Sequence, residues 1–164
     1  MRNSRGRTLI ELVIVLSTTV ILISAIGFHF QGWLNNCRAE SEVKEMYVDL
    51  MEARVRAMQQ NRAHFVVINA DNYKVFEDTN DNSQYDAGTD KSTMFAAPKE
   101  PAKTWCLWTG TVIIDDRGLA RTDPGPNGTI RFDAGAGDPD YDCIVVSPTR
   151  INMGKWDGKS CIAR

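Results

Sequence analysis

Few side chains in this sequence have the type and spacing that catalysis needs. The chain contains only two histidines, His29 and His64, and it has no P-loop, no H-E-x-x-H zinc motif and no G-x-S-x-G nucleophile motif. The adjacent carboxylates Asp115 and Asp116 would face opposite sides of a strand, which makes them a poor acid–base pair. The sequence therefore predicts a protein that is not an enzyme.

An alternation of oxygen-bearing side chains matches part of a calcium-binding loop. The pattern uses positions 1, 3, 5, 7 and 9 of such a loop, and the residue at position 7 binds through its backbone carbonyl. These positions are held by Asp78, Asn80, Asn82, Gln84 and Asp86. Two parts are missing, because Ser83 replaces the glycine of the sharp turn and Thr89 replaces the glutamate of position 12. Calcium is the only cofactor that the sequence suggests, but from the sequence we favour a simple polar turn between strands.

The four cysteines have no C-x-x-C spacing, which argues against a zinc site and leaves disulfides as their expected use. Three connectivities exist for four cysteines. We favour Cys143 with Cys161, because this bond would close the last hairpin with a loop of modest length. Cys37 either pairs with Cys106 or stays free, and the sequence leaves both options open.

The elements that would carry these residues are strands in the second part of the chain. Short runs rich in β-forming residues alternate with Asn, Asp, Gly and Pro turns. The predicted strands are residues 64–68, 73–77, 111–114, 129–132, 143–147 and 150–156, and residues 91–103 are expected to form an irregular loop.

A long helix is predicted before these strands. Apolar residues recur at steps of three and four, as on one helix face, and Glu40–Lys44 and Glu52–Arg56 add favourable ion pairs. Gly27 and Gly32 are the expected weak points of the helix. The apolar face consists of Val43, Met46, Tyr47, Leu50, Ala53, Ala57 and Met58.

Charge is distributed unevenly along the chain, although its total of 19 basic and 21 acidic residues is ordinary for a globular protein. Three arginines lie within residues 1–7, and residues 12–28 contain no charged side chain. This pattern predicts a membrane-spanning helix with a cytoplasmic amino terminus. A secretory signal cleaved before Phe28 is the alternative, but the apolar run is long for such a signal and has Glu11 near its start.

The residues at the amino terminus resemble the class III signal of type IV pilins and pseudopilins. The matching run is Gly6-Arg7-Thr8-Leu9-Ile10-Glu11-Leu12, which opens the apolar segment. The resemblance implies that prepilin peptidase cleaves after Gly6, that Arg7 becomes the N-methylated first residue, and that Glu11 is required for filament assembly. The family usually has phenylalanine in place of Arg7. Since residues four apart share a helix face, we expect Arg7 to pair partly with Glu11 in the monomer.

The second half of the chain resembles, more loosely, the FimT and H-type (GspH) branch of minor pilins. The resemblance rests on Tyr73-Lys-Val-Phe-Glu-Asp and on the run Cys-Ile-Val-Val-Ser-Pro-Thr-Arg at residues 143–150. Some FimT-type members bind DNA through a basic Gly-Arg-x-Arg run, of which this chain keeps only Arg150. Arg150 and Lys155, with Lys159, leave a small positive cluster for a DNA contact.

The expected architecture is an α+β, pilin-like protein in which a long N-terminal helix packs against a C-terminal antiparallel β-rich head. The expected parts are a leader at residues 1–6, a transmembrane half of the helix at 7–30, an amphipathic half at 31–61 and the head at 62–164. The resemblance implies a structural minor subunit of a type IV pilus or type II secretion pseudopilus in the inner membrane, with a periplasmic head. Its implied partners are other pilins or pseudopilins, prepilin peptidase and the inner-membrane assembly platform. The alternative is a binding module at a pilus tip that captures DNA or a surface ligand.

Overall fold

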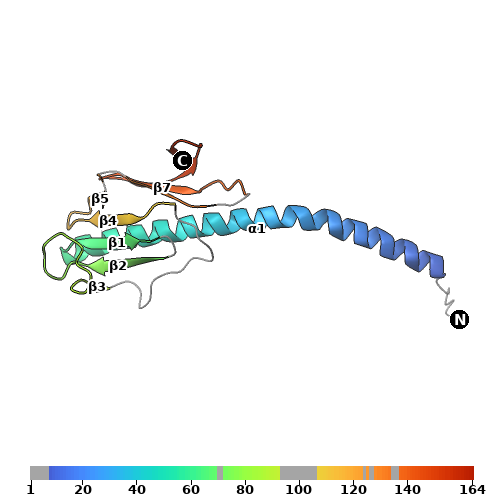
Figure 1. The fold of residues 1–164 in the computed structure, drawn as a ribbon, viewed down its shortest axis with the longest axis horizontal. Coiled ribbons are helices and arrows are strands. Elements are labelled where there is room, and N and C mark those ends of the chain that lie inside the picture. Colours follow the sequence, from blue (N-terminus) through green and yellow to red (C-terminus); the bar gives the residue numbers. More distant parts are fainter. Residues whose placement is uncertain (1–7, 70–71, 93–106, 124, 126–127, 134–136) are drawn as a thin grey trace.

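The computed structural model shows one long helix that carries a β-rich head along its C-terminal half (Figure 1). It describes residues 8–69, 72–92, 107–123, 125, 128–133 and 137–164, and for residues 25–31 it describes the backbone only. The leader and Gly6 and Arg7 lie outside the described residues, as do Cys106 and most of the loop predicted at 91–103. The α+β class predicted from the sequence is confirmed.

Helix α1 runs from Leu9 to Gln60, a length of 52 residues or about 78 Å. It continues without a break through Gly27 and Gly32. The helix ends at Asn61, whose left-handed backbone (φ 51°) lets its N–H bond to the carbonyl of Ala57. One continuous rod therefore joins the amino terminus to the head.

The head-facing side of α1 follows the predicted apolar face. Five of its residues are fully buried, in steps of three and four: Val43, Met46, Leu50, Ala53 and Ala57. Tyr47 is half-buried and packs against this cluster, whereas Met58 is 43% exposed, so the prediction for Met58 is wrong. Met58 still contacts the turn at Gly118, whose missing Cβ would lie 2.8 Å from its sulfur.

The first sheet has five antiparallel strands in the order β3-β2-β1-β4-β5. Its strands are β1 His64–Ile68, β2 Tyr73–Glu77, β3 Lys91–Ser92, β4 Gly110–Ile114 and β5 Ala120–Asp123. The second sheet has four antiparallel strands in the order β6-β7-β8-β9. These are β6 Gly128–Arg131, β7 Cys143–Val146, β8 Ile151–Trp156 and β9 Cys161–Ala163.

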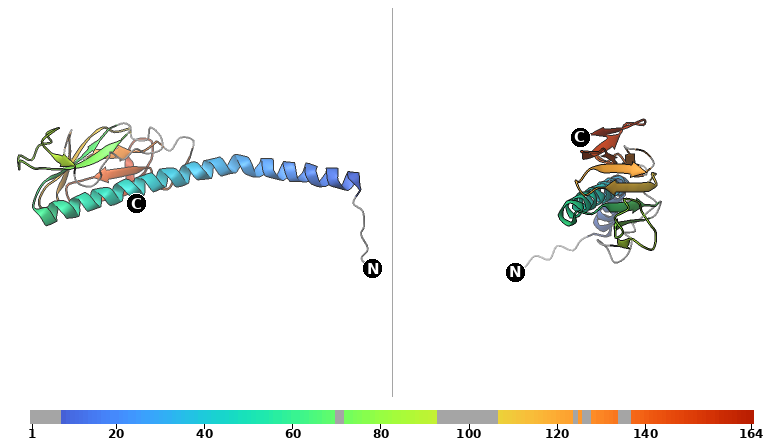
Figure 2. Two further views of the ribbon diagram at one scale, coloured as in Figure 1. Left: turned by 90° about the horizontal axis from the view of Figure 1, so that it is seen from below. Right: turned by 90° about the vertical axis from the view of Figure 1, so that its left-hand side faces the viewer.

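Both sheets pack on the same stretch of α1. The helix contacts β1 and β4 of the first sheet and β7 and β8 of the second, and one core cluster includes residues of all of them. Figure 2 shows the head lying on one side of the C-terminal half of the helix, while the N-terminal half extends away from it. The helix is therefore the common support of two sheets whose described strands do not pair with each other.

Three strands differ from the sequence prediction. β3 lies at the start of the segment predicted as an irregular loop, and β9 was not expected. β5 was missed because its sequence is polar, although Ala120 and Thr122 face the interior and Arg121 and Asp123 face outwards. All three lie at a sheet edge, where pairing with one neighbour is enough to order a short polar segment.

A transmembrane half of α1 was expected at residues 7–30. Among the residues that the structure describes, no helix has both the length and the apolar character needed to cross a membrane.

Candidate functional site

The amino-terminal end of α1 carries Glu11, the residue that the sequence links to assembly. Glu11 lies in the first turn and is exposed, and its backbone N–H bonds to the carbonyl of Thr8 at 3.1 Å. A carboxylate is favourable there because the unpaired N–H groups give this end of a helix a partial positive charge. Since Arg7 lies outside the described residues, its pairing with Glu11 stays a prediction.

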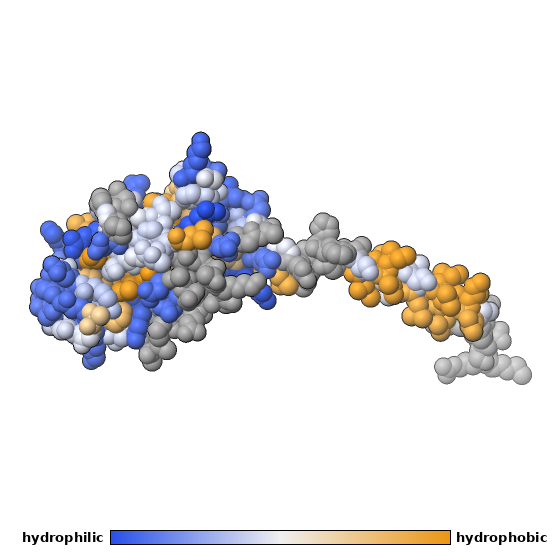
Figure 3. All heavy atoms as spheres, in the orientation of Figure 1, coloured by the Kyte–Doolittle hydropathy of each residue, from blue (hydrophilic) through white to orange (hydrophobic). Residues whose placement is uncertain are grey.

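The segment of α1 that follows Glu11 exposes a largely apolar surface, mostly orange in Figure 3. Its large apolar side chains range from 49% exposed at Val13 to 68% at Ile21. The hydroxyls of Ser17, Thr18, Thr19 and Ser24 all donate to backbone carbonyls of the preceding turn, at 2.6–3.1 Å. This segment therefore satisfies its own polar side chains and leaves an apolar surface for another partner.

The head is attached to α1 by polar contacts as well as by the apolar core. Glu40 accepts a hydrogen bond from the backbone N–H of Asp140 at 3.0 Å and pairs with Lys44 at 3.1 Å. The Asp140 N–H, and then Lys44, hold the pKa of Glu40 below its usual value. The second predicted pair, Glu52–Arg56, is also present. Farther along the helix, Arg54 donates to the carbonyl of Thr149 at 3.3 Å.

A buried hydrogen bond links β2 to the part of α1 that packs against the head. The hydroxyl of Tyr73 donates to the carboxylate of Asp49, and the two residues are only 3% and 6% exposed. Burial, and then the Asp49 carboxylate, raise the pKa of the Tyr73 hydroxyl well above its usual range. The phenol therefore stays protonated and remains a donor to Asp49.

His64 opens β1 and is fully buried. Its Nδ1 lies 3.2 Å from the carbonyl of Arg62, and its Nε2 has no partner within the described residues. Desolvation lowers the pKa of the imidazole, although the Arg62 carbonyl and Glu77 oppose this shift. The side chain is therefore packed inside the head.

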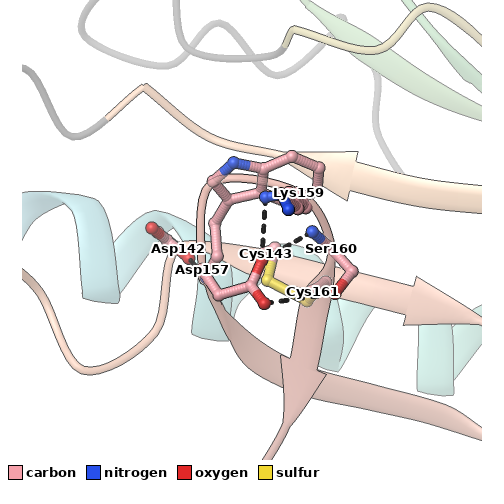
Figure 4. The surroundings of a disulfide bond; sticks show 7 residues. Asp142, Cys143, Asp157, Lys159, Ser160 and Cys161 are labelled. Atoms are coloured by element: carbon pink, nitrogen blue, oxygen red, sulfur yellow. Dashed lines mark hydrogen bonds between the residues drawn. A yellow bond between two sulfur atoms is a disulfide. The ribbon is translucent and has the colours of Figure 1, made fainter.

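The disulfide joins Cys143 and Cys161, which is the pairing favoured from the sequence (Figure 4). It connects β7 to β9, so it encloses two successive hairpins rather than only the last one. Cys37 is exposed and unpaired in the part of the chain that the structure describes.

Gly154 permits this bond and was missed in the sequence analysis. It lies on β8 between Cys143 of β7 and Ala163 of β9. A Cβ at this position would be 2.8 Å from Sγ of Cys161 and would collide with the backbone carbonyl of Ile162. A glycine within a strand indicates that another group comes close to the backbone, but the sequence does not show that this group is the Cys161–Ile162 segment.

The turn between β8 and β9 is ordered by Asp157, as Figure 4 shows. Its carboxylate accepts the backbone N–H groups of Ser160 at 2.7 Å and of Lys159 at 2.8 Å, and these bonds lower the pKa of Asp157. Within the turn, Gly158 adopts φ 99°, a conformation that other residues rarely take.

The proposed DNA-contact residues do not come together. Arg150 precedes β8 and Lys155 lies near its other end, which separates their backbones by about 16 Å at the rise of an extended strand. Lys155 also pairs with Asp138 at 2.6 Å. Within the described residues, these two cations therefore do not form one phosphate-binding patch.

The five residues of the predicted calcium loop lie in the connection between β2 and β3. Asn80 and Asn82 both donate to the same oxygen of Asp86, and Ser83 N–H donates to Asp78 at 2.7 Å. Within the described residues, no three or more His, Cys, Asp or Glu side chains are grouped so that they could hold a metal ion.

The arrangement of one long helix with an exposed apolar end and an antiparallel β head is typical of pilin-like filament subunits. Residues 42–150 match the family described as type II transport protein GspH, so the chain belongs to this family. No curated protein and no solved structure matches the chain. The family supports a structural, type II secretion pseudopilin-like subunit.

The family match covers the upper helix and most of the head but neither end of the chain. It begins at residue 42 of α1 and stops just before β8. Glu11 and the β8–β9 hairpin with Cys161 lie beyond it. The family match therefore gives no information on Glu11 or on the last hairpin.

Proposed function

We propose that this chain is a minor pseudopilin of a type II secretion system whose helix is inserted in the inner membrane. In this proposal, prepilin peptidase cleaves after Gly6 and methylates Arg7, and Glu11 then directs assembly with other pseudopilins on the inner-membrane platform. The head lies in the periplasm, where the Cys143–Cys161 disulfide can persist.

The observation that carries the proposal is the contrast between the two halves of one helix. In the upper half, side chains such as Val43 and Leu50 are fully buried by the chain's own head. In the lower half, Leu9 is 82% exposed and Ile23 is 65% exposed. Exposed apolar surface of this extent is unfavourable in water, so it needs lipid or a neighbouring helix.

The charges at the amino terminus support the orientation and the role of Glu11. Arg2, Arg5 and Arg7 precede the uncharged run at residues 12–28, and basic residues stay on the cytoplasmic side of a membrane. A carboxylate inside the membrane costs about 2.5–3.5 kcal/mol. A positive amino terminus on a neighbouring subunit would offset this cost, which favours assembly over isolated subunits.

Two measurements test the proposal in cells that carry the secretion system. Mass spectrometry of the purified chain is expected to find Arg7 as the first residue, with a methylated amine. For assembly, Glu11→Gln removes the charge and Glu11→Asp keeps it. We expect Glu11→Gln to abolish cross-linking to other pseudopilins and Glu11→Asp to retain part of it.

The competing interpretations give different results. A mature chain that begins at Phe28 would identify a cleaved secretory signal, and a chain that retains Met1 would exclude processing at Gly6. Cross-linking that is equal in both Glu11 variants and in the unmodified chain would overturn the assembly role of the carboxylate.

A further inference from the structure

Asp78 is a carboxylate buried at the start of the loop between β2 and β3. It is 1% exposed, and its Oδ2 accepts the N–H of Ser83, five residues farther on, at 2.7 Å. The side chain therefore points into the loop. Its other oxygen, Oδ1, is buried without a hydrogen-bond partner among the described residues. A buried, unpartnered carboxylate oxygen is costly unless a donor or a cation reaches it.

The arginines that reach this loop bind other groups. Arg62 pairs with Glu77 at 3.2 Å and with Asp81 at 4.0 Å. Arg121 donates to the carbonyl of Ser83 at 3.2 Å. Both leave Oδ1 of Asp78 without a positively charged partner among the described residues.

Two side-chain amides of the same loop carry further oxygens that can bind a cation. The side-chain oxygen of Asn80 accepts the N–H of Asn82 at 3.3 Å, and that of Asn82 accepts the N–H of Gln84 at 2.8 Å. Each of these amide oxygens has a second lone pair that can bind a cation. The two amide nitrogens both donate to Oδ2 of Asp86, which fixes the orientation of both side chains.

The backbone of the loop is bent at two positions that match a calcium loop. Asp81 and Ser83, at positions 4 and 6, adopt positive φ angles of 55° and 58°. Ser83 thus makes the turn for which glycine is usual. The sharp turn that the sequence lacked by residue type is present in the structure.

The far end of the loop is closed by Asp90 rather than by a residue at position 12. Asp90 is 7% exposed and accepts the backbone N–H groups of Asp86 at 2.7 Å and Thr79 at 3.4 Å. It therefore holds the two ends of the loop together. Because this carboxylate is already engaged, the ligand set is one buried carboxylate with amide, carbonyl and water oxygens. Low ligand charge predicts weak binding, with Kd of about 0.1–1 mM.

We propose that the loop from Asp78 to Asp90 binds one calcium ion. Its ligands are Oδ1 of Asp78, the side-chain oxygens of Asn80 and Asn82 and the backbone carbonyl of Gln84, and Asp86 binds through a water molecule. The ion neutralises the buried carboxylate and locks the connection between β2 and β3. This loop lies at the end of the molecule farthest from the amino terminus (Figure 1), so the site is independent of membrane insertion and of Glu11.

The test measures thermal unfolding of the purified full-length chain in detergent with calcium, magnesium or EDTA at matched ionic strength. At a calcium concentration of about 10 mM, we expect the Tm to rise by about 3–8 °C over EDTA, with a smaller rise in magnesium. An equal rise in magnesium would indicate a nonspecific ionic effect and overturn the proposal, as would no rise in calcium.

The matched variants are Asp78→Asn and Asp81→Asn, which make the same change in one loop. Asp78→Asn is expected to lose the calcium shift, whereas Asp81→Asn, whose side chain is 70% exposed, should keep it. If Asp78→Asn does not fold, Asn82→Ala removes an exposed ligand and should reduce the shift. If both single variants fold and both keep the full calcium-dependent Tm shift, the proposed site is wrong. If only one of them folds, a full shift in that variant has the same meaning.

Discussion

At the scale of single residues, the most consequential groups are polar side chains that the head buries. Asp49 and Tyr73 meet between the helix and β2, and His64 is enclosed at the start of β1. A buried polar group stabilises the fold only while its partner is present or while it stays uncharged. Each of these residues therefore gives a specific expectation for stability.

Tyr73→Phe is expected to lower the free energy of unfolding by about 1–3 kcal/mol, because it removes a donor from a buried carboxylate. Urea unfolding of the full-length chain in detergent measures the change. Tyr85→Phe is the control, since the Tyr85 ring packs against Phe65 and Phe76 and its hydroxyl has no hydrogen bond to the described residues. Equal effects of the two substitutions would show that the bond to Asp49 adds no stability.

His64 is expected to make the head less stable as the pH falls. Its folded pKa is lowered by desolvation, so below the ordinary histidine pKa of about 6.5 the unfolded chain binds a proton that the folded chain rejects. Above about pH 6.5, His64 should therefore not reduce the free energy of unfolding. Below that pH, the free energy of unfolding should decrease by at most about 1.4 kcal/mol per pH unit until the folded pKa of His64 is reached.

Denaturant unfolding between pH 5 and pH 8 measures this slope. His64→Phe should remove this contribution to the pH dependence. The contribution of Glu40 should remain, and it is lost only as the pH falls below the usual carboxyl pKa, because the folded pKa of Glu40 is lowered. An identical pH profile in the variant would show that His64 does not titrate differently in the folded and unfolded chains.

At the scale of elements, α1 has two different surfaces that serve different purposes. Its upper half buries one face against both sheets, whereas its opposite side is exposed. Val43 and Val48 illustrate the difference, because they are five positions apart on one helix and are 0% and 58% exposed.

The same substitution at these two positions separates burial from helix propensity. Val43→Ala is expected to cost about 2 kcal/mol, from lost apolar burial and a small cavity. Val48→Ala should change stability by less than about 0.5 kcal/mol, since alanine favours the helix and no core contact is lost. Thermal or urea unfolding of the two variants checks the difference. Similar losses at both sites would mean that the exposed face of α1 is covered in the purified protein.

At the scale of the whole molecule, the head consists of two sheets that share the helix and one apolar core, and they contact each other through β5, β6 and β7. The second sheet ends in the short strand β9, which the disulfide ties to β7 over Gly154. The cross-link therefore compensates for a terminal strand of three residues with few buried side chains.

Cys161→Ser is expected to lower the free energy of unfolding by about 3 kcal/mol, because the bond closes a loop with a sequence separation of 18. Cys37→Ser, which alters an exposed thiol that is unpaired within the described residues, should leave stability unchanged under the same conditions. Unfolding with and without reductant measures both effects. A Cys161→Ser variant as stable as the oxidised protein would show that the β9 hairpin contributes nothing to the cooperative unit.

Local patterns in the sequence were enough to predict much of the fold. The helix, the six strands with clear β-forming runs, the buried positions from Val43 to Ala57 and the Cys143–Cys161 pairing all follow from periodicity, turn residues and spacing. They follow because each depends on neighbours within a few residues or on a short loop. The amino-terminal pattern at Gly6 and Glu11 is likewise a property of the sequence alone.

Contacts between distant segments were decided only by the tertiary structure. The polar edge strand β5 exists because β4 pairs with it, and Gly154 matters because the chain returns over it nine residues later as β9. The burial of Asp78 also depends on the tertiary structure, and the meeting of Asp49 with Tyr73 depends on how the first sheet lies on the helix. The physical reason is that contacts between residues far apart in the chain depend on long-range packing, which local residue patterns do not encode.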